Sequence, residues 1–400
     1  MKILFPYMAR WHSLNWSRYH SLLIALAQRG HEIHVLQPPA MRSQETNFVE
    51  IEAVSVAGVH VHDVPMPGWL WNRRLPFDKL VKKAAYSIGS VRLARRMARE
   101  LGITHVLLYN IPQAPLARLP GVCTVFDFAD DYMDMLRHEL GRFNNPVLMF
   151  LANALLRHMF RAARLVTTVS NVLAHQVSGP VQVLANGVST AKIARAKAAM
   201  ATLPANTRPV VGFLGSFEYF IDFDLILDTA QRMPSVDFVL VGRGRDHAHV
   251  QAEVARRRLG NVKLTGGVPH SEVFDHLARM DICLNIFRKI PVSERACPIK
   301  LFEYAAMRKP IVSTRLAELP HVDADFLYYA DTPAEAQACI EDILGQPERA
   351  RERAARGHDH VMANYTWEKI AGDFEAAAQH ASGDTPRGRL VPTAVRGAQA

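Results

Sequence analysis

The chain contains 400 residues, of which 49% are hydrophobic and 21% are charged. This length exceeds what one ordinary hydrophobic core holds, so we expect two domains. No apolar run reaches the ~18 residues of a membrane-spanning helix, and segment 1–12 resembles a first strand more than a signal peptide. The four cysteines are scattered and include no CxxC pair, which favours free thiols in a cytoplasmic protein over disulfides or a metal site.

The formal net charge is +9, which indicates a polyanionic partner such as nucleic acid, anionic lipid or a phosphorylated substrate. Much of this charge lies in residues 69–99, which contain nine Lys or Arg residues and one acid, interleaved with Trp and Leu. This segment is either a solvated helix face or a surface that lies on an anionic membrane, here the inner face of the plasma membrane. Because no nucleic-acid-binding motif accompanies the charge, we do not expect nucleic acid to be a partner.

Short apolar runs alternate with helical stretches along the chain, a pattern typical of parallel sheets covered by helices on both faces. The predicted strands of the first half are 2–5, 32–37, 104–110, 123–128 and 165–170, with helices at 16–29 and 146–164. Those of the second half are 209–215, 238–244, 262–267, 281–286 and 311–314. We therefore expect an α/β protein with two doubly wound Rossmann-like domains that face a central cleft.

The expected domain limits follow from this alternation and from composition. The N-terminal domain would span 1–185 and the C-terminal domain 209–365, joined by a linker at 186–208 that is rich in Ala and Lys and then in Pro, Asn and Thr. Residues 366–381 form a last predicted helix. The polar, basic segment 382–400 is expected to be disordered.

The most informative segment is 297–314, CPIKLFEYAAMRKPIVST, which follows the apolar run 281–286. Pro298 suits the first position of a helix, where its missing N–H costs nothing, and the helix would stop before Pro310. A helix N-terminus just beyond the carboxyl end of a strand is where an open parallel sheet binds phosphate groups. Glu303, one turn into the helix, is placed to bind sugar hydroxyls. The segment therefore predicts a site for a nucleotide diphosphate carrying a sugar.

Five motifs, in order, resemble the GT-B glycosyltransferases, and most closely their large retaining family 4. They are LANGV (184–188), VGFLGSFEYFIDFDLI (211–226), FVLVGRG (238–244), NVKLTGGV (261–268) and CPIKLFEYAAMRKPIVST (297–314). The resemblance is specific from about residue 165 to 315 and is mainly one of fold before residue 160. It implies sugar transfer with retention of anomeric configuration and without a bound metal. It also implies that the helix around Trp367 crosses back to the N-terminal domain.

The resemblance assigns a role to Glu303, which corresponds to the second glutamate of the family's paired-glutamate motif and would bind the ribose hydroxyls of the nucleotide. The first glutamate should stand eight residues earlier, where this chain has Arg295. Either Glu294 takes its place after a loop shift, or this branch dispenses with it. The family's basic clamp on the donor phosphates is also absent, since Ser216 and Asp222 occupy the matching positions.

Positive charge for the diphosphate must then come from other groups, and the candidates are Arg243, Arg288, Lys289 and Lys300. Lys300 opposes the helix dipole in the first turn of its helix, which a bound diphosphate would explain. Asp222 and Asp224 are better explained as helix caps. Glycines 215, 242, 244 and 266 fall at strand ends, where a Cβ would obstruct a ligand. The predicted donor-binding residues are Gly215, Ser216, Arg243, Pro298, Ile299, Lys300, Leu301 and Glu303.

Acidic residues follow the predicted strand 123–128, where the family usually has a histidine on the acceptor side. Asp127 occupies that position, with Asp130 and Asp131 close by. Clustered carboxylates repel, so one of them should have a raised pKa and could take the proton of the acceptor. A helix cap with solvated acids is the alternative. The predicted catalytic residues are Asp127, Asp130 and Glu294.

The loop after the first strand contains Trp11, His12 and Trp16, where relatives often have two adjacent glycines. These side chains either line the acceptor side of the cleft or are simply buried. We expect a glycosyltransferase that moves a sugar from a UDP- or GDP-sugar to a polysaccharide or lipid-linked acceptor in envelope or exopolysaccharide biosynthesis. A sugar-nucleotide epimerase of related fold and an inactive nucleotide-sugar-binding subunit are the alternatives.

Overall fold

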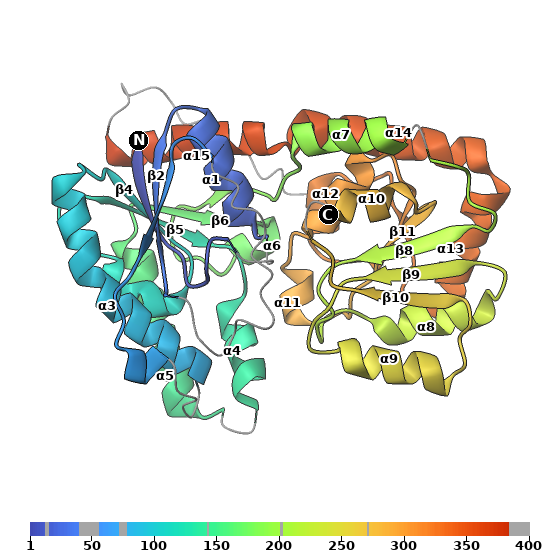
Figure 1. The fold of residues 1–400 in the computed structure, drawn as a ribbon, viewed down its shortest axis with the longest axis horizontal. Helices are drawn as coiled ribbons and strands as arrows, with labels where there is room; N and C mark the ends of the chain where they lie inside the picture. Colours follow the sequence, from blue (N-terminus) through green and yellow to red (C-terminus); the bar gives the residue numbers. More distant parts are fainter. Residues whose placement is uncertain are drawn as a thin grey trace, which may run out of the picture.

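In a computed structural model, the chain folds into two α/β halves, each built on a parallel sheet (Figure 1). The structure describes residues 1–12, 16–39, 56–71, 78–141, 144–200, 203–269 and 272–383. The expectation of disorder for 382–400 therefore concerns a segment that lies almost wholly outside the described residues.

The N-terminal sheet has seven strands in the order β3-β2-β1-β4-β5-β6-β7, all parallel. Its strands are β1 (Lys2–Pro6), β2 (Glu32–Gln37), β3 (Val59–Asp63), β4 (His105–Leu108), β5 (Cys123–Phe128), β6 (Leu165–Thr168) and β7 (Gln182–Val183). Its helices are α1 (Arg18–Gln28), α2 (Gly68–Trp71), α3 (Asp78–Glu100), η2 (Ile111–Leu116), α4 (Tyr132–Leu140), α5 (Pro146–Ala162) and α6 (Asn171–Ala174). The central strands are buried, as their near-continuous apolar sequences predict.

The C-terminal sheet has six parallel strands in the order β10-β9-β8-β11-β12-β13. These are β8 (Val210–Leu214), β9 (Asp237–Val241), β10 (Val262–Gly266), β11 (Ile282–Asn285), β12 (Ile311–Ser313) and β13 (Tyr328–Tyr329). The helices are α8 (Phe223–Arg232), α9 (His247–Arg256), α10 (Val273–Ala278), α11 (Pro291–Glu294), α12 (Ile299–Ala306), η4 (Leu319–Val322), α13 (Pro333–Gly345) and α14 (Pro347–Asn364). Both sheets thus follow the same doubly wound order, and the carboxyl ends of their strands face each other (Figure 1).

Two crossings of the chain join the halves. The segment expected as a linker contains a helix, α7 (Thr190–Met200), and the return crossing leads into α15 (Trp367–Ser382). At the crossing, the Val188 amide donates to the Tyr365 carbonyl at 2.9 Å and the Trp367 amide donates to the Val188 carbonyl at 2.9 Å. A Cβ on Gly187 would approach Ile370 Cδ1 to 2.6 Å and the Tyr365 oxygen to 3.0 Å, so this close approach requires glycine.

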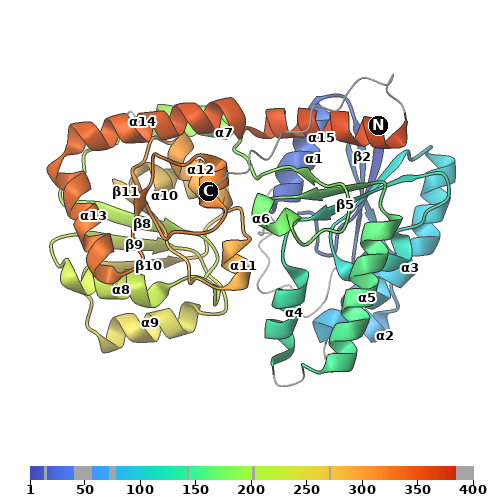
Figure 2. The same ribbon diagram turned by 180° about the vertical axis from the view of Figure 1, so that it is seen from behind.

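Helix α15 lies against α1 in the N-terminal half, on the far side of the crossing from α14 (Figures 1 and 2). Its buried face contributes Trp367, Ile370 and Phe374 to the same core cluster as Leu22 and Leu26 of α1. The C-terminal residues therefore complete the N-terminal core. No helix among the described residues combines the length and apolar character needed to cross a membrane.

Candidate functional site

Helix α12 begins beyond the carboxyl end of β11, at the edge of the C-terminal sheet that faces the N-terminal half (Figure 1). Pro298 is its N-cap rather than its first helical residue, and the helix ends at Ala306, earlier than expected. The hydroxyl of Tyr304 accepts a hydrogen bond from the Leu214 amide at 2.8 Å and lies 3.3 Å from the Leu214 carbonyl. This fully buried anchor holds the helix against the end of β8, next to Gly215.

Lys300 extends from the first turn of α12 along the end of β8. Its Nζ lies 4.0 Å from the centroid of the Phe213 ring and 4.9 Å from that of Phe287. A Cβ on Gly215, which has a φ of +148°, would lie 2.9 Å from the same Nζ. Burial lowers the pKa of Lys300 to about 7, against the opposing effect of Glu303. Lys300 and Gly215 therefore lie together, as the prediction of a donor site requires.

Glu303 faces two lysines from different parts of the chain. Desolvation by the surrounding protein raises the pKa of the Glu303 carboxyl to about 7, while the positive charges of Lys192 and Lys300 lower it. Lys192 belongs to α7, and burial lowers its pKa to about 8. Its Nζ also lies 3.9 Å from the ring centroid of Trp16 in the N-terminal half. Sequence reasoning missed Lys192 because it lies in the presumed linker.

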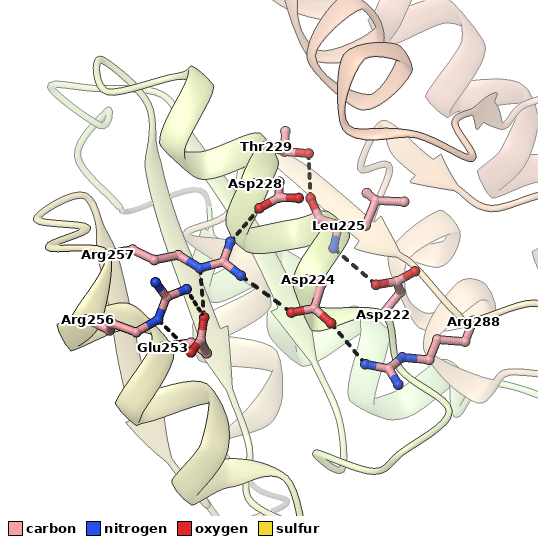
Figure 3. Close-up of polar contacts among 9 residues, drawn as sticks. All are labelled: Asp222, Asp224, Leu225, Asp228, Thr229, Glu253, Arg256, Arg257 and Arg288. Carbon is pink, nitrogen blue, oxygen red and sulfur yellow. Dashed lines mark hydrogen bonds and ion pairs between the residues drawn. The ribbon is translucent and has the colours of Figure 1, made fainter.

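Most other basic candidates for a phosphate clamp are paired with acids. Arg288 Nη2 donates to Asp224 Oδ2 at 3.1 Å (Figure 3). Lys289 Nζ lies 2.8 Å from Asp331 Oδ2. Asp224 is thus an ion-pair partner of Arg288 and not a helix cap. Arg243 is exposed and forms no salt bridge with any residue in the described part of the chain; its side chain lies across Gly267.

The loop around Ser216 begins at Gly215 and leads to the N-cap of α8. Ser216 is exposed beside Gly215, and Asp222 is the N-cap of α8, accepting from the Leu225 amide at 3.0 Å (Figure 3). Gly242, with a φ of +142°, lies so close to the Gly215 carbonyl that a Cβ would come within 1.9 Å of its oxygen. Backbone packing between strand ends therefore requires glycine here before any ligand is considered.

Arg295 connects the two halves of the molecule. Its Nη1 is bonded to Asp131 Oδ2, and its backbone carbonyl accepts from Ser170 Oγ at 2.6 Å. Nearby, the Glu318 carboxylate accepts from the Asn171 amide at 2.9 Å, at the start of α6. Glu294 accepts from the amide of Ala317 at 2.6 Å and so bonds its own domain's loop. Its role as a substitute for the first glutamate stays a prediction.

The three acids after β5 lie in different environments. Asp127 is buried and pairs with buried Arg18, whose Nε lies 3.1 Å from Asp127 Oδ2; Thr167 donates to Asp127 Oδ1 at 2.6 Å. Asp131 caps α4 and bonds Arg295. Asp130 is exposed, yet desolvation by the surrounding protein, together with Asp127 and Asp131, raises the pKa of its carboxyl to about 6 against the opposing effect of Arg18. Of the three, only Asp130 forms no salt bridge within the described part of the chain, and its exposure leaves it open to an acceptor.

The aromatic loop after β1 is organised by His20, which the sequence did not single out. Trp11 is only 5% exposed and stacks on His20, with ring centroids 4.3 Å apart, so it belongs to the core and not to an acceptor surface. Trp16 stacks on the same imidazole at 5.0 Å and faces Lys192. His12 is partly exposed. Burial lowers the pKa of His20 to about 4, so this histidine is neutral at physiological pH.

No group of three or more His, Cys, Asp or Glu side chains is arranged to hold a metal ion among the described residues. A pocket of about 560 Å³ in the C-terminal half is lined by residues including Asn206, Lys263, His276 and Arg279. It contains none of the predicted site residues. The candidate site lies instead at the facing edges of the sheets, where Lys192, Lys300 and Glu303 come together at the N-terminus of α12.

Three comparisons place these observations among known proteins. Residues 224–376 match the family described as glycosyl transferase-like. A teichuronic acid biosynthesis glycosyltransferase of Bacillus subtilis (strain 168), TuaH, is 31% identical over 140 residues, which are 34% of this chain and 35% of that protein. The chain thus spans about a third of the length of this curated relative.

Solved structures match over nearly the whole chain. Sucrose-phosphate synthase from Thermosynechococcus elongatus has a TM-score of 0.74 at 15% identity, over 96% of this chain and all of that one. HepE of Anabaena in complex with UDP has a TM-score of 0.64 at 13% identity, over 95% of this chain and all of that one. The chain therefore has the GT-B fold, as its sequence predicted, and residues 224–376 are similar to the glycosyl transferase-like family.

Proposed function

We propose that the chain is a glycosyltransferase that moves a sugar from a nucleotide diphosphate sugar to a saccharide or lipid-linked acceptor in the synthesis of an envelope or exported polysaccharide. The observation that carries the proposal is the N-terminus of α12, where Lys300 and Glu303 meet beside Gly215 at the edge that faces the other domain. A helix N-terminus and a lysine suit a diphosphate, and a carboxylate suits ribose hydroxyls. The sequence match to TuaH and the UDP-bound HepE structure support the same class of reaction.

The proposed chemistry assigns each group a task. The amides of Ile299 and Lys300 and the ammonium of Lys300 would stabilise the charge on the leaving diphosphate, so that no metal ion is required. Leu301 is fully buried, so its side chain would support this turn through packing. Its amide donates to the Pro298 carbonyl at 3.2 Å, which also holds the turn in place. Asp130 would accept the proton of the acceptor hydroxyl. Retention of configuration and UDP or GDP as the carrier are parts of the proposal that rest on the resemblance, and the proposed cytoplasmic location rests on the scattered cysteines.

A nucleotide screen by thermal shift tests the donor half of the proposal. UDP or GDP at 100 times its dissociation constant should stabilise the wild-type protein by about 2.7 kcal/mol, and Glu303→Gln should weaken that response. The matched control is Glu318→Gln, which removes a buried carboxylate that bonds across the domain interface and not to the proposed ligand. A response that is equal in wild type and Glu303→Gln would exclude the proposed nucleotide contact.

Turnover separates the alternatives. Slow release of free sugar from the cognate nucleotide sugar without acceptor indicates a transferase, whereas conversion of UDP-N-acetylglucosamine to its epimer indicates an epimerase. A binding subunit without catalysis is one further candidate. Arg295 stands at the position of the family's first glutamate and is paired with Asp131, which favours this candidate. Tight nucleotide binding with neither reaction, under every acceptor tried, would support that candidate.

A further inference from the structure

Large apolar side chains that are exposed to solvent concentrate on one part of the N-terminal half. Of nine such residues in the described part of the chain, seven lie on α2, α3 and α5, and the other two are Met135 of α4 and Leu344 of α13. We call the seven residues the apolar tip: Trp69, Val81, Ile88, Val147, Phe150, Leu151 and Leu155. Several are more than 60% exposed, including Trp69 at 67% and Phe150 at 64%. Single exposed apolar residues are ordinary, but a group of this kind indicates an interaction surface.

The topology brings these residues to the same end of the domain. Helix α3 directly precedes β4 and α5 precedes β6, and both strands belong to one parallel sheet. The two helices must therefore run in the same direction, and both pack on η2. Figures 1 and 2 show them side by side, with α2 near the start of α5. Five members of the apolar tip lie in the first halves of α3 and α5, Leu155 lies just past the middle of α5, and Trp69 is on α2, so the members lie toward one end.

The second halves of the same helices carry arginines. These are exposed residues Arg92, Arg95, Arg96 and Arg99 on α3, and Arg157, Arg161 and Arg164 on or just after α5. Helix α5 contains no acidic residue, and the acids of α3 are its two end residues, Asp78 and Glu100. Along α5, Leu151 and Arg157 are six residues apart, or roughly 9 Å of helix axis. Apolar groups followed by cations at this spacing match the acyl boundary and the phosphate layer of a membrane.

We propose that the apolar tip docks on an anionic lipid bilayer, with the arginines of α3 and α5 at the level of the lipid phosphates. A bilayer fits better than another protein because the cations on both helices have few acidic neighbours and all share one sign. This surface shares Trp69, Val81, Ile88 and the four arginines of α3 with the segment 69–99 and adds the residues of α5. Lys82 is buried and paired with Asp78 at 2.9 Å, and Arg73 and Arg74 lie outside the described residues. Helix α5, which the sequence did not assign to a membrane, supplies most of the apolar contact.

Vesicle flotation of the full chain tests the docking directly. Wild type should float with vesicles of phosphatidylcholine and phosphatidylglycerol at about a 7:3 ratio, and much less with phosphatidylcholine alone. The double variant Phe150→Glu/Leu151→Glu should reduce the bound fraction at least about tenfold. Arg157→Ala/Arg161→Ala should weaken binding to anionic vesicles by about fivefold per arginine. All four side chains are exposed, so these variants should fold normally.

Matched controls lie on the other half of the molecule. Leu344→Glu changes an exposed leucine of α13, and Arg349→Ala/Arg351→Ala removes two exposed arginines of α14; both should float like wild type. Failure of wild type to float, or equal losses in the controls, would overturn the proposal. The proposal would also be overturned if the wild-type protein did not bind lipid but formed a concentration-dependent dimer that Phe150→Glu/Leu151→Glu abolished. The docking extends the proposed function by placing the enzyme where a lipid-linked acceptor is found. The tip variants should still be stabilised by UDP or GDP in the thermal-shift assay. This measurement separates a loss of membrane docking from a loss of nucleotide binding.

Discussion

Replacing Asp127 by asparagine distinguishes a structural carboxylate from a catalytic one. Asp127 is 1% exposed and its partner Arg18 is 6% exposed, so the substitution leaves a guanidinium without its counter-charge inside the protein. Removing one partner of a buried ion pair typically costs about 3–5 kcal/mol. Arg18 keeps bonds to Asn186 Oδ1 at 2.9 Å and to the Leu184 carbonyl at 3.3 Å, which favours the lower end, about 3 kcal/mol. For a domain of this size, that loss lowers the melting temperature by roughly 6–12 °C.

The assay compares thermal unfolding with turnover in the same preparations. Asp127→Asn should lose stability by the amount above and keep measurable activity at low temperature. Asp130→Asn, three residues away and exposed, is the internal control and should melt within about 2 °C of wild type. The reasoning fails if Asp127→Asn melts like wild type while its turnover falls more than about 100-fold. That result would make Asp127 the base and its pairing with Arg18 incidental.

Three further predictions concern the site and the domain crossing. Binding of a nucleotide diphosphate should take up protons above pH 7, because the pKa of Lys300 is lowered to about 7 in the free protein and rises beside the diphosphate; affinity should therefore fall as pH increases from 7. Calorimetry in two buffers should show that both Lys300→Met, which has no titratable group, and Lys300→Arg, whose guanidinium stays protonated, lose this proton uptake, while only Lys300→Arg keeps a cation for the diphosphate. Asp130→Asn should lower kcat/KM by about 10²–10⁴-fold, and the wild-type value should rise as pH increases through about 6, since the base must be ionised; a flat profile would contradict this role. Gly187→Ala should destabilise by about 1–3 kcal/mol through overlap with the return crossing, whereas Gly260→Ala, which meets no atom within 4 Å, should be nearly neutral in the same melting experiment.

The fold could be predicted because buried parallel strands give long apolar runs with helices between them. The central strands of both sheets were recognised on this basis. The edge strands β3, β7 and β13 were missed, since short or half-exposed strands lack a continuous apolar run. Helix α7 was taken for a linker because its sequence, TAKIARAKAAM, is rich in small residues and has only a narrow apolar face. That error also hid Lys192, whose importance comes from its neighbours in space.

The positions of the residues proposed for the donor half of the site could be predicted because they are local in sequence. Gly215 and the first turn of α12 are fixed by strand ends and helix starts, and these can be read along the chain. The partners of charged residues were not predictable in the same way. Arg295 pairs with Asp131 from 164 positions away, and Asp127 pairs with an arginine of the first helix. A charge in a sequence does not show whether a counter-charge from another domain has already neutralised it.

The return of the chain to its starting domain has a consequence for biosynthesis. Helix α15 supplies Trp367, Ile370 and Phe374 to the core that α1 begins, so the N-terminal domain lacks part of its interior until these residues have been synthesised. The C-terminal sheet is complete by residue 329 and can fold while the N-terminal half still waits for this helix. During that interval the apolar face of α1 is not covered by α15. The order of synthesis is therefore the reverse of the order in which the two cores are completed.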